Sequence, residues 1–160
     1  MSGATAGSVE RVRSALLAAG HPDTITAFPA GTRTAADAAA AVGCEVAQIA
    51  KSIVFRAGGR AVVVITSGAN RVDSAKVERV LGVKLGRADA DWVREATGFA
   101  IGGVAPVGHS SPPLVLMDED LMVLDPVWAA AGSPSHVFRT TPAELLRMAG
   151  ARVAAIREER

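Results

Sequence analysis

The chain has 160 residues, of which 49% are hydrophobic, and its 17 basic and 16 acidic residues leave a net charge of +1. This length suits one domain with a sizeable core and leaves no room for a second. The charge is not that of a protein that coats nucleic acid through many phosphate contacts. We therefore expect no DNA partner, and any RNA contact should be local and confined to a small patch.

The single cysteine, Cys44, excludes an intramolecular disulfide and a cysteine-cluster metal site. It has no evident activating partner in the sequence, so we interpret it as an inert small apolar residue, with a nucleophile as the alternative. The first residues lack the basic start and apolar run of a secretory signal. The longest apolar runs are far shorter than the about 20 residues that cross a bilayer. These features predict a cytoplasmic protein without a membrane partner.

The first structural signal is a helix that begins at Ser8, carries apolar residues on one face and stops at Gly20. We expect residues 1–8 to be disordered, residues 9–156 to form the single domain, and residues 157–160 to be a charged tail.

Helix and strand signals alternate along the rest of the chain. A capping box at Thr34-Ala-Ala-Asp37 and a Thr141-Pro142 start predict two of the helices. Ala57-Gly58-Gly59-Arg60 predicts a hairpin turn, and Asp118-Glu119-Asp120 predicts a second. The predicted strands are 24–28, 52–56, 61–66, 83–85, 114–117, 121–124, 135–139 and 151–156, and the later helices are 34–43, 73–82, 89–97 and 141–150. This pattern predicts an α/β fold of the α+β type, with a mixed, largely antiparallel sheet surrounded by helices.

The segment Gly98–His109, called the glycine loop below, shows neither the apolar periodicity of a helix nor that of a strand. It holds four glycines and a proline. Glycine lets the main chain approach a ligand closely, and unpaired N–H groups in such a loop can hold an anion or an oxyanion. The alternative is an ordinary tight connection between a helix and a strand. The spacing fits neither a Walker A loop nor a dinucleotide fingerprint. We predict that the loop lines the main pocket, with at least two of its backbone N–H groups unpaired within the protein and pointing into the cavity.

Lys51 stands at the start of a predicted strand, where a lysine is typically a solvated strand end. The functional alternative is a cation aimed into a cleft, which predicts that its ammonium points into the pocket lined by the glycine loop. His109 closes that loop and is the best candidate among the three histidines for a functional role. The alternative is that it makes an ordinary hydrogen bond at the surface. The sequence shows no metal-ligand spacing and no serine-hydrolase elbow, so no metal is expected.

Four stretches carry a resemblance to known proteins: Ala50-Lys51-Ser52-Ile-Val-Phe, the predicted helix from Val72 to Gly82, the segment Thr97–Gly108 with the glycine loop, and the segment from Gly132 to Leu145. Together they resemble the YbaK/ProX family, the stand-alone relatives of the editing domain inserted in bacterial prolyl-tRNA synthetases. The likeness runs in order over nearly the whole chain. It implies a curved sheet, hydrolysis of the ester that links a wrong amino acid to tRNA, and no cofactor.

The resemblance also implies roles for particular residues. Lys51 falls on the family's characteristic lysine and would hold the aminoacyl ester or the terminal adenosine phosphate. The implied substrate-binding positions are Phe99, Gly102, Gly103, Pro106, Gly108, His109 and Gly132. Family members lack a protein nucleophile, and attack is attributed to water helped by the ribose hydroxyl, or to the substrate's own thiol. The implied partners are the acceptor end of a mischarged tRNA and prolyl-tRNA synthetase.

The resemblance leaves the edited amino acid open. Cys-tRNA(Pro) is our first substrate hypothesis, followed by another small amino acid on tRNA, because the late Gly-His motif of the alanine-specific branch is absent. Two other functions also stay open. One is a non-catalytic module of the same fold that binds a tRNA acceptor end or a synthetase. The other is a small-molecule hydrolase unrelated to tRNA.

Overall fold

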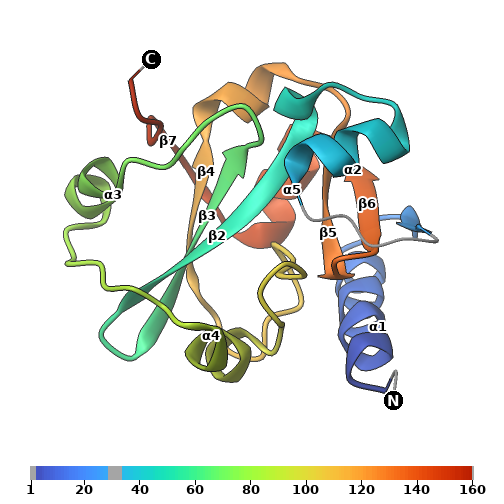
Figure 1. Cartoon of the computed structure of the whole chain (residues 1–160), viewed down its shortest axis with the longest axis horizontal. Helices are drawn as coiled ribbons and strands as arrows, with labels where there is room; N and C mark the ends of the chain where they lie inside the picture. Colours follow the sequence, from blue (N-terminus) through green and yellow to red (C-terminus); the bar gives the residue numbers. More distant parts are fainter. Residues whose placement is uncertain (1–2, 29–33, 160) are drawn as a thin grey trace.

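The computed structural model of the chain describes residues 3–28 and 34–159, which form a mixed seven-stranded sheet with helices on both faces (Figure 1). The strands are β1 (Ile25–Ala27), β2 (Ile49–Ala57), β3 (Arg60–Ser67), β4 (Leu114–Asp118), β5 (Val127–Ser133), β6 (His136–Thr140) and β7 (Arg152–Ala154). The α-helices are α1 (Gly3–Ala18), α2 (Ala35–Val42), α3 (Ser74–Leu81), α4 (Ala90–Thr97) and α5 (Pro142–Ala149). Two 3₁₀ turns complete the described elements, η1 (Val46–Gln48) and η2 (Glu119–Val123). The predicted mixed α/β single domain is confirmed.

The order of the strands in the sheet is β1-β6-β5-β2-β3-β4-β7. The pairs β1/β6, β5/β6 and β2/β3 are antiparallel, whereas β2/β5, β3/β4 and β4/β7 are parallel. The sheet therefore joins an antiparallel unit at one end to a unit that contains parallel pairs, and the parallel contact between β2 and β5 is the seam between the two.

The central strand β3 is buried on both faces, and its side chains alternate between two core clusters. Val63 and Ile65 belong to the larger cluster, to which α1, α4, α5 and the glycine loop contribute. Val62 and Val64 face the smaller cluster under α3. This two-sided burial places β3 between the two core clusters.

The helix boundaries follow local capping chemistry. Thr34 forms the predicted capping box with Asp37, and Asp73, Asp89 and Thr141 accept hydrogen bonds from the first turns of α3, α4 and α5. Each of these four helices ends at a glycine in the left-handed conformation, and these four ends agree with the predictions.

Three local predictions differ from the structure. The second hairpin does not form, because the buried Asp118 side chain accepts a hydrogen bond from Asp120 N and the chain turns into η2. Residues 83–85 make no strand, and only Gly86 bridges to Arg56. Strand β5 was not predicted, because its run of alanines has little intrinsic preference for a strand.

Near both ends of the described chain, the structure adds to the prediction. Helix α1 begins at Gly3 rather than after Ser8, so residues 3–8, expected to be disordered, are helical. In the expected tail, Arg157 pairs with Asp120 at 2.7 Å and Glu159 pairs with Lys76 at 2.6 Å. Within the described ranges, no helix is long and apolar enough to cross a membrane.

Candidate active site

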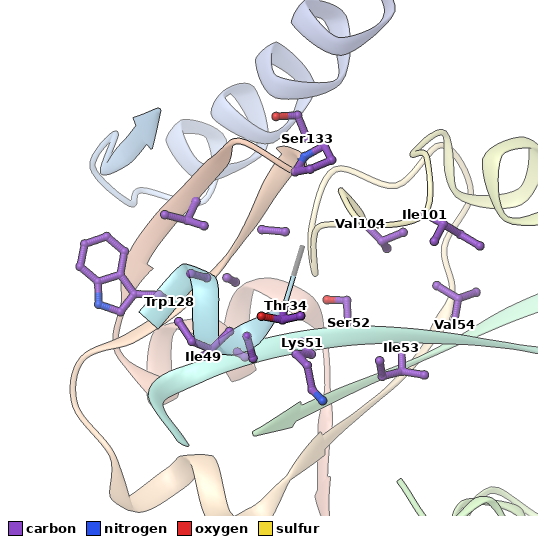
Figure 2. Close-up of a pocket in the computed structure, with 18 of the residues that line it drawn as sticks. Thr34, Ile49, Lys51, Ser52, Ile53, Val54, Ile101, Val104, Trp128 and Ser133 are labelled. Carbon is purple, nitrogen blue, oxygen red and sulfur yellow. The ribbon is translucent and has the colours of Figure 1, made fainter. Parts of the chain in front are cut away.

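The main pocket lies at the seam of the sheet, where β2 and β5 part (Figure 2). These two parallel strands pair only through Ile49 with Trp128 and Ala50 with Ala129. Beyond that point β2 continues with β3, and β5 continues with β6. The resulting cavity of about 380 Å³ is bounded by the start of α2, α4, both diverging strands and the tip of the glycine loop.

The side chains that line the pocket are mostly apolar, and several of them are alanines. Ala38, Ala50, Ala129 and Ala130 contribute methyl groups, and Val104 reaches in from the glycine loop. The lining residues with polar side chains are Thr34, Lys51, Ser52, Ser133 and His136. A cavity of this size, apolar with a few polar groups, is typical of a small-molecule subsite.

The Ser52 hydroxyl is a pocket-lining group whose hydrogen-bonding capacity is unused within the described part of the chain. Its Oγ atom is buried and has no hydrogen-bond partner among the described residues. Figure 2 shows the Ser52 side chain on the same side of β2 as Val104 and Ile101. Leaving a buried hydroxyl unpaired costs about 1–3 kcal/mol, so a ligand that bonds to Ser52 would recover this loss.

Lys51 lines the pocket with the inner part of the residue, but its ammonium is turned away. Adjacent strand residues point to opposite faces, and Figure 2 shows the Lys51 nitrogen on the opposite side of β2 from the Ser52 hydroxyl. The Lys51 Nζ atom lies 3.5 Å from Asn70 O, at the long limit for a hydrogen bond. The prediction that this nitrogen points into the pocket is therefore not met in this structure.

Only the tip of the glycine loop reaches the pocket, through Ile101, Gly102 and Val104. Gly103 packs against β5 instead: a Cβ atom there would lie 2.7 Å from Ser133 Cα, and its own N–H donates to Ala100 O at 3.0 Å. The other predicted substrate-binding residues lie outside the pocket lining: they are Phe99, Pro106, Gly108, His109 and Gly132.

These residues behind the pocket are packed tightly. Phe99 and Pro106 are buried. Gly108 and Gly132 lie against the backbone of α1, where an added Cβ would come within 3.3 Å of Arg11 O and 2.7 Å of Ser8 C, respectively. The glycines that indicated a ligand loop therefore serve close backbone packing at Gly103 and Gly108, leave room for the Arg11 side chain at Gly98, and line the pocket at Gly102.

His109 is one of these packed residues, and burial keeps its ring neutral. Nε2 lies 2.6 Å from Ala105 O, and since a carbonyl can only accept, Nε2 carries the proton. Nδ1 is buried without a partner in the described structure. Burial lowers the pKa of His109; the bond to Ala105 raises it, and the Arg11 guanidinium lowers it. The net direction is downward.

This lowered pKa predicts acid sensitivity of the glycine loop. In the unfolded chain the His109 pKa is near its ordinary value of about 6.5, so below that pH the unfolded state binds more protons than the folded state. The stabilisation is therefore intact above about pH 6.5 and is lost as the pH falls toward the folded-state pKa. Urea unfolding at about pH 7.5 and about pH 5.5 should show a larger loss of unfolding free energy in the wild type than in His109→Gln.

Comparing wild type with His109→Gln cancels the contributions of other groups that titrate in acid. The pKa values of Asp23, Glu144 and Glu159 are also lowered, by hydrogen bonds to Arg13, Arg147 and Lys76, respectively. Their effects fall at lower pH and are common to both proteins. Equal pH dependence in wild type and His109→Gln would show that His109 is not a buried neutral group.

Ser133 and His136 are pocket residues that sequence reasoning missed. They face each other across the tight turn between β5 and β6, with Ser133 Oγ 2.6 Å from His136 Nδ1. Ser133 Oγ also accepts the Ser135 N–H at 3.1 Å, and Ser133 is only 2% exposed. Ser133 begins a Ser-Pro-Ser segment, which is typical of a turn, and the signal that could have found the pair is the histidine directly after this segment.

No metal-binding group emerges from the described parts of the chain, where no three His, Cys, Asp or Glu side chains are grouped to hold an ion. Cys44 is half-buried, and its Sγ donates to Glu45 O at 3.3 Å. Burial raises the pKa of the Cys44 thiol, and the Glu45 carboxylate raises it further. A raised pKa lowers the thiolate fraction, which is the reactive form.

Comparison with known proteins connects this site to a family. The family described as the aminoacyl-tRNA editing domain matches residues 29–148. The uncharacterized protein YwhH of Bacillus subtilis (strain 168) is 31% identical over 139 residues, which cover 86% of this chain and 88% of YwhH. A proline–tRNA ligase of Desulforamulus reducens is 28% identical over 113 residues, which cover 70% of this chain but 20% of the ligase.

The fold leads to the same group of proteins. A crystal structure of a candidate trans-editing enzyme for prolyl tRNA synthetase superposes with a TM-score of 0.90 at 48% identity, and the match covers 95% of this chain and 98% of the other. The matched segment 29–148 includes β2, the glycine loop and the β5–β6 turn, which together form the pocket. The chain belongs to the aminoacyl-tRNA editing domain family.

Proposed function

We propose that this protein is an aminoacyl-tRNA deacylase, which hydrolyses the ester between a wrongly attached small amino acid and its tRNA. The observation that carries the proposal is the pocket at the β2–β5 seam, which is small, mostly apolar and formed by the segments that the family shares. Cys-tRNA(Pro) is the first substrate to consider, and we place the reaction in the cytoplasm, where aminoacylation supplies the substrate.

The shape of the pocket supports a small side chain as the part of the substrate that is recognised. Alanines from β2 and β5 leave room for an aliphatic or thiol-bearing group, and Ser52 Oγ supplies a hydrogen bond within reach. The Gly102 backbone at the loop tip also lines the pocket, where its N–H group is suited to face the ester carbonyl.

The ionisable side chains supply two further roles. His136 is suited to receive the proton of the attacking water or ribose hydroxyl, since imidazole is the commonest general base. Lys51 holds a phosphate of the acceptor end rather than the ester, because its ammonium lies on the other side of β2 from the Ser52 hydroxyl and makes a long contact with Asn70 O. A flexible four-carbon stem suits such a contact.

A panel of charged tRNAs tests the proposal. Cys-tRNA(Pro), Ala-tRNA(Pro) and Pro-tRNA(Pro) are each incubated with enzyme, and the remaining ester is followed over time. We expect faster loss of at least one mischarged species than in buffer, with Pro-tRNA(Pro) spared. Binding without hydrolysis would favour the non-catalytic module, and hydrolysis of simple esters with no effect on any tRNA would favour a small-molecule hydrolase.

The same assay tests whether a metal or the thiol takes part. Excess EDTA and the Cys44→Ser substitution should each leave the deacylation rate largely unchanged, because the thiol has a raised pKa and its donor bond points to Glu45 O. Loss of turnover with EDTA, restored by adding back one metal, would establish a metal mechanism. Loss in Cys44→Ser with an unchanged melting temperature would establish a thiol mechanism.

A further inference from the structure

One side chain of α1 bridges the two ends of the glycine loop. The half-buried Arg11 donates from Nη2 to Gly98 O at 2.7 Å and from Nε to Gly108 O at 3.1 Å. These carbonyls belong to opposite ends of the loop, so one planar guanidinium fixes the distance between them. A lysine has a single nitrogen and cannot reproduce this two-point geometry.

The loop is shaped to receive this side chain. A Cβ atom at Gly98 would lie 2.5 Å from Arg11 Nη2, and one at Gly108 would lie 3.3 Å from Arg11 O. Glycine at both positions therefore makes room for the arginine and for the helix backbone behind it.

An aromatic contact adds to the hydrogen bonds. The Arg11 guanidinium carbon lies 4.6 Å from the centre of the Phe99 ring, and this ring meets His109 edge-on at 5.2 Å. Phe99 is fully buried, and a guanidinium at this distance is attracted to the face of the ring. Arg11 thus contacts a carbonyl at each end of the loop and one ring within it.

We propose that Arg11 is a positioning residue for the active site, which acts through the glycine loop and holds its tip at the pocket. Helix α1 lies outside the family-matched segment 29–148, so the site depends on an element that the family match does not include. The effect on catalysis rests on the proposed deacylase function, whereas the effect on the loop does not.

The link from Arg11 to the reaction is geometric. The loop tip, with Ile101, Gly102 and Val104, is the part that lines the pocket, and its position follows from where the loop ends are held. A displacement of about 1 Å in a reacting group can cost about 10²-fold in rate. Loss of the bridge is therefore expected to slow the chemical step about ten- to a hundredfold.

Hydrogen exchange read by mass spectrometry tests the bridge itself. Arg11→Met keeps a long apolar stem but removes the donors, and amides of residues 99–109 should then exchange at least about tenfold faster, with β3 unchanged. Arg13→Met is the matched control, because Arg13 lies on the same helix and pairs with Glu10 and Asp23 instead of the loop. If Arg11→Met does not fold, Arg11→Lys replaces it, with a smaller effect in the same direction.

Single-turnover deacylation of the same proteins tests the catalytic part. Loop-specific exchange with a slower rate in Arg11→Met, and neither change in Arg13→Met, supports the proposal. Unchanged loop exchange overturns it, as does faster exchange that extends equally to β3, or a loosened loop with an undiminished rate. Loop-specific exchange in a protein whose wild type deacylates nothing would refute the proposed function and leave the bridge established.

Discussion

Replacing Lys51 by alanine is expected to lower kcat/KM for deacylation about ten- to a hundredfold while the protein folds normally. A hydrogen bond to a charged group contributes about 1.5–3 kcal/mol, which corresponds to this range of rates. Among the described residues, the hydrogen bond of the ammonium is a long one, 3.5 Å to Asn70 O, so its loss should change the melting temperature little. We expect the effect mainly in KM, because a phosphate contact forms in the ground state as well as in the transition state.

The control for this experiment is Lys76→Ala, which removes a lysine that does not line the pocket and whose ammonium bonds to Arg157 O and Glu159. Lys51→Arg should restore binding in part, since a phosphate also accepts a guanidinium. A tenfold or greater fall in kcat with KM unchanged would place the ammonium at the ester instead. A Lys51→Ala protein with parental kcat/KM would remove this lysine from the reaction.

The second large effect is expected from Gly103→Ala, which should displace the glycine loop. The added Cβ would lie 2.7 Å from Ser133 Cα and 2.9 Å from Ser133 N, and backbone atoms of a paired strand cannot move aside as a side chain would. Overpacking of this kind costs about 1–3 kcal/mol. The loop must then move away from β5, and its tip with it, so deacylation should fall by at least about tenfold.

A second glycine in the β2–β3 hairpin is the matched control. Gly59 has open space around a Cβ atom, so Gly59→Ala should stay within about ±0.5 kcal/mol of the parent in urea unfolding. Gly103→Ala that unfolds at the same urea concentration as Gly59→Ala, with an unchanged deacylation rate, would show that the loop does not need its close approach to β5.

Sequence reasoning succeeded where the cause is local. The caps of α2, α3, α4 and α5 depend on residues within a few positions of one another, and the β2–β3 hairpin depends on its four-residue turn. Strand β5 could not be predicted from local sequence, because alanine does not favour a strand. The strand forms through pairing with β2 and β6, whose residues are not all close to it in the chain.

The site itself was predicted only in part, because its geometry depends on the seam between β2 and β5. Strand alternation indicates that Lys51 and Ser52 face opposite sides, but which side holds the pocket depends on where β2 and β5 part. Likewise, the sequence could not show that Gly108 packs on α1, or that the β5–β6 turn brings His136 to the pocket. Both arrangements require contacts between distant segments.

The measurement that tests the central claim most directly is single-turnover deacylation with the pocket filled. Ala130 lines the pocket and is half-buried, so Ala130→Leu places an isobutyl group in the space proposed for the amino acid. Ala143→Leu makes the same change on the exposed side of α5 and serves as the control. We expect Ala130→Leu to melt near the parent and lose at least about tenfold in rate, with Ala143→Leu unchanged. Equal rates in all three proteins would contradict the assignment of this pocket as the site of ester hydrolysis.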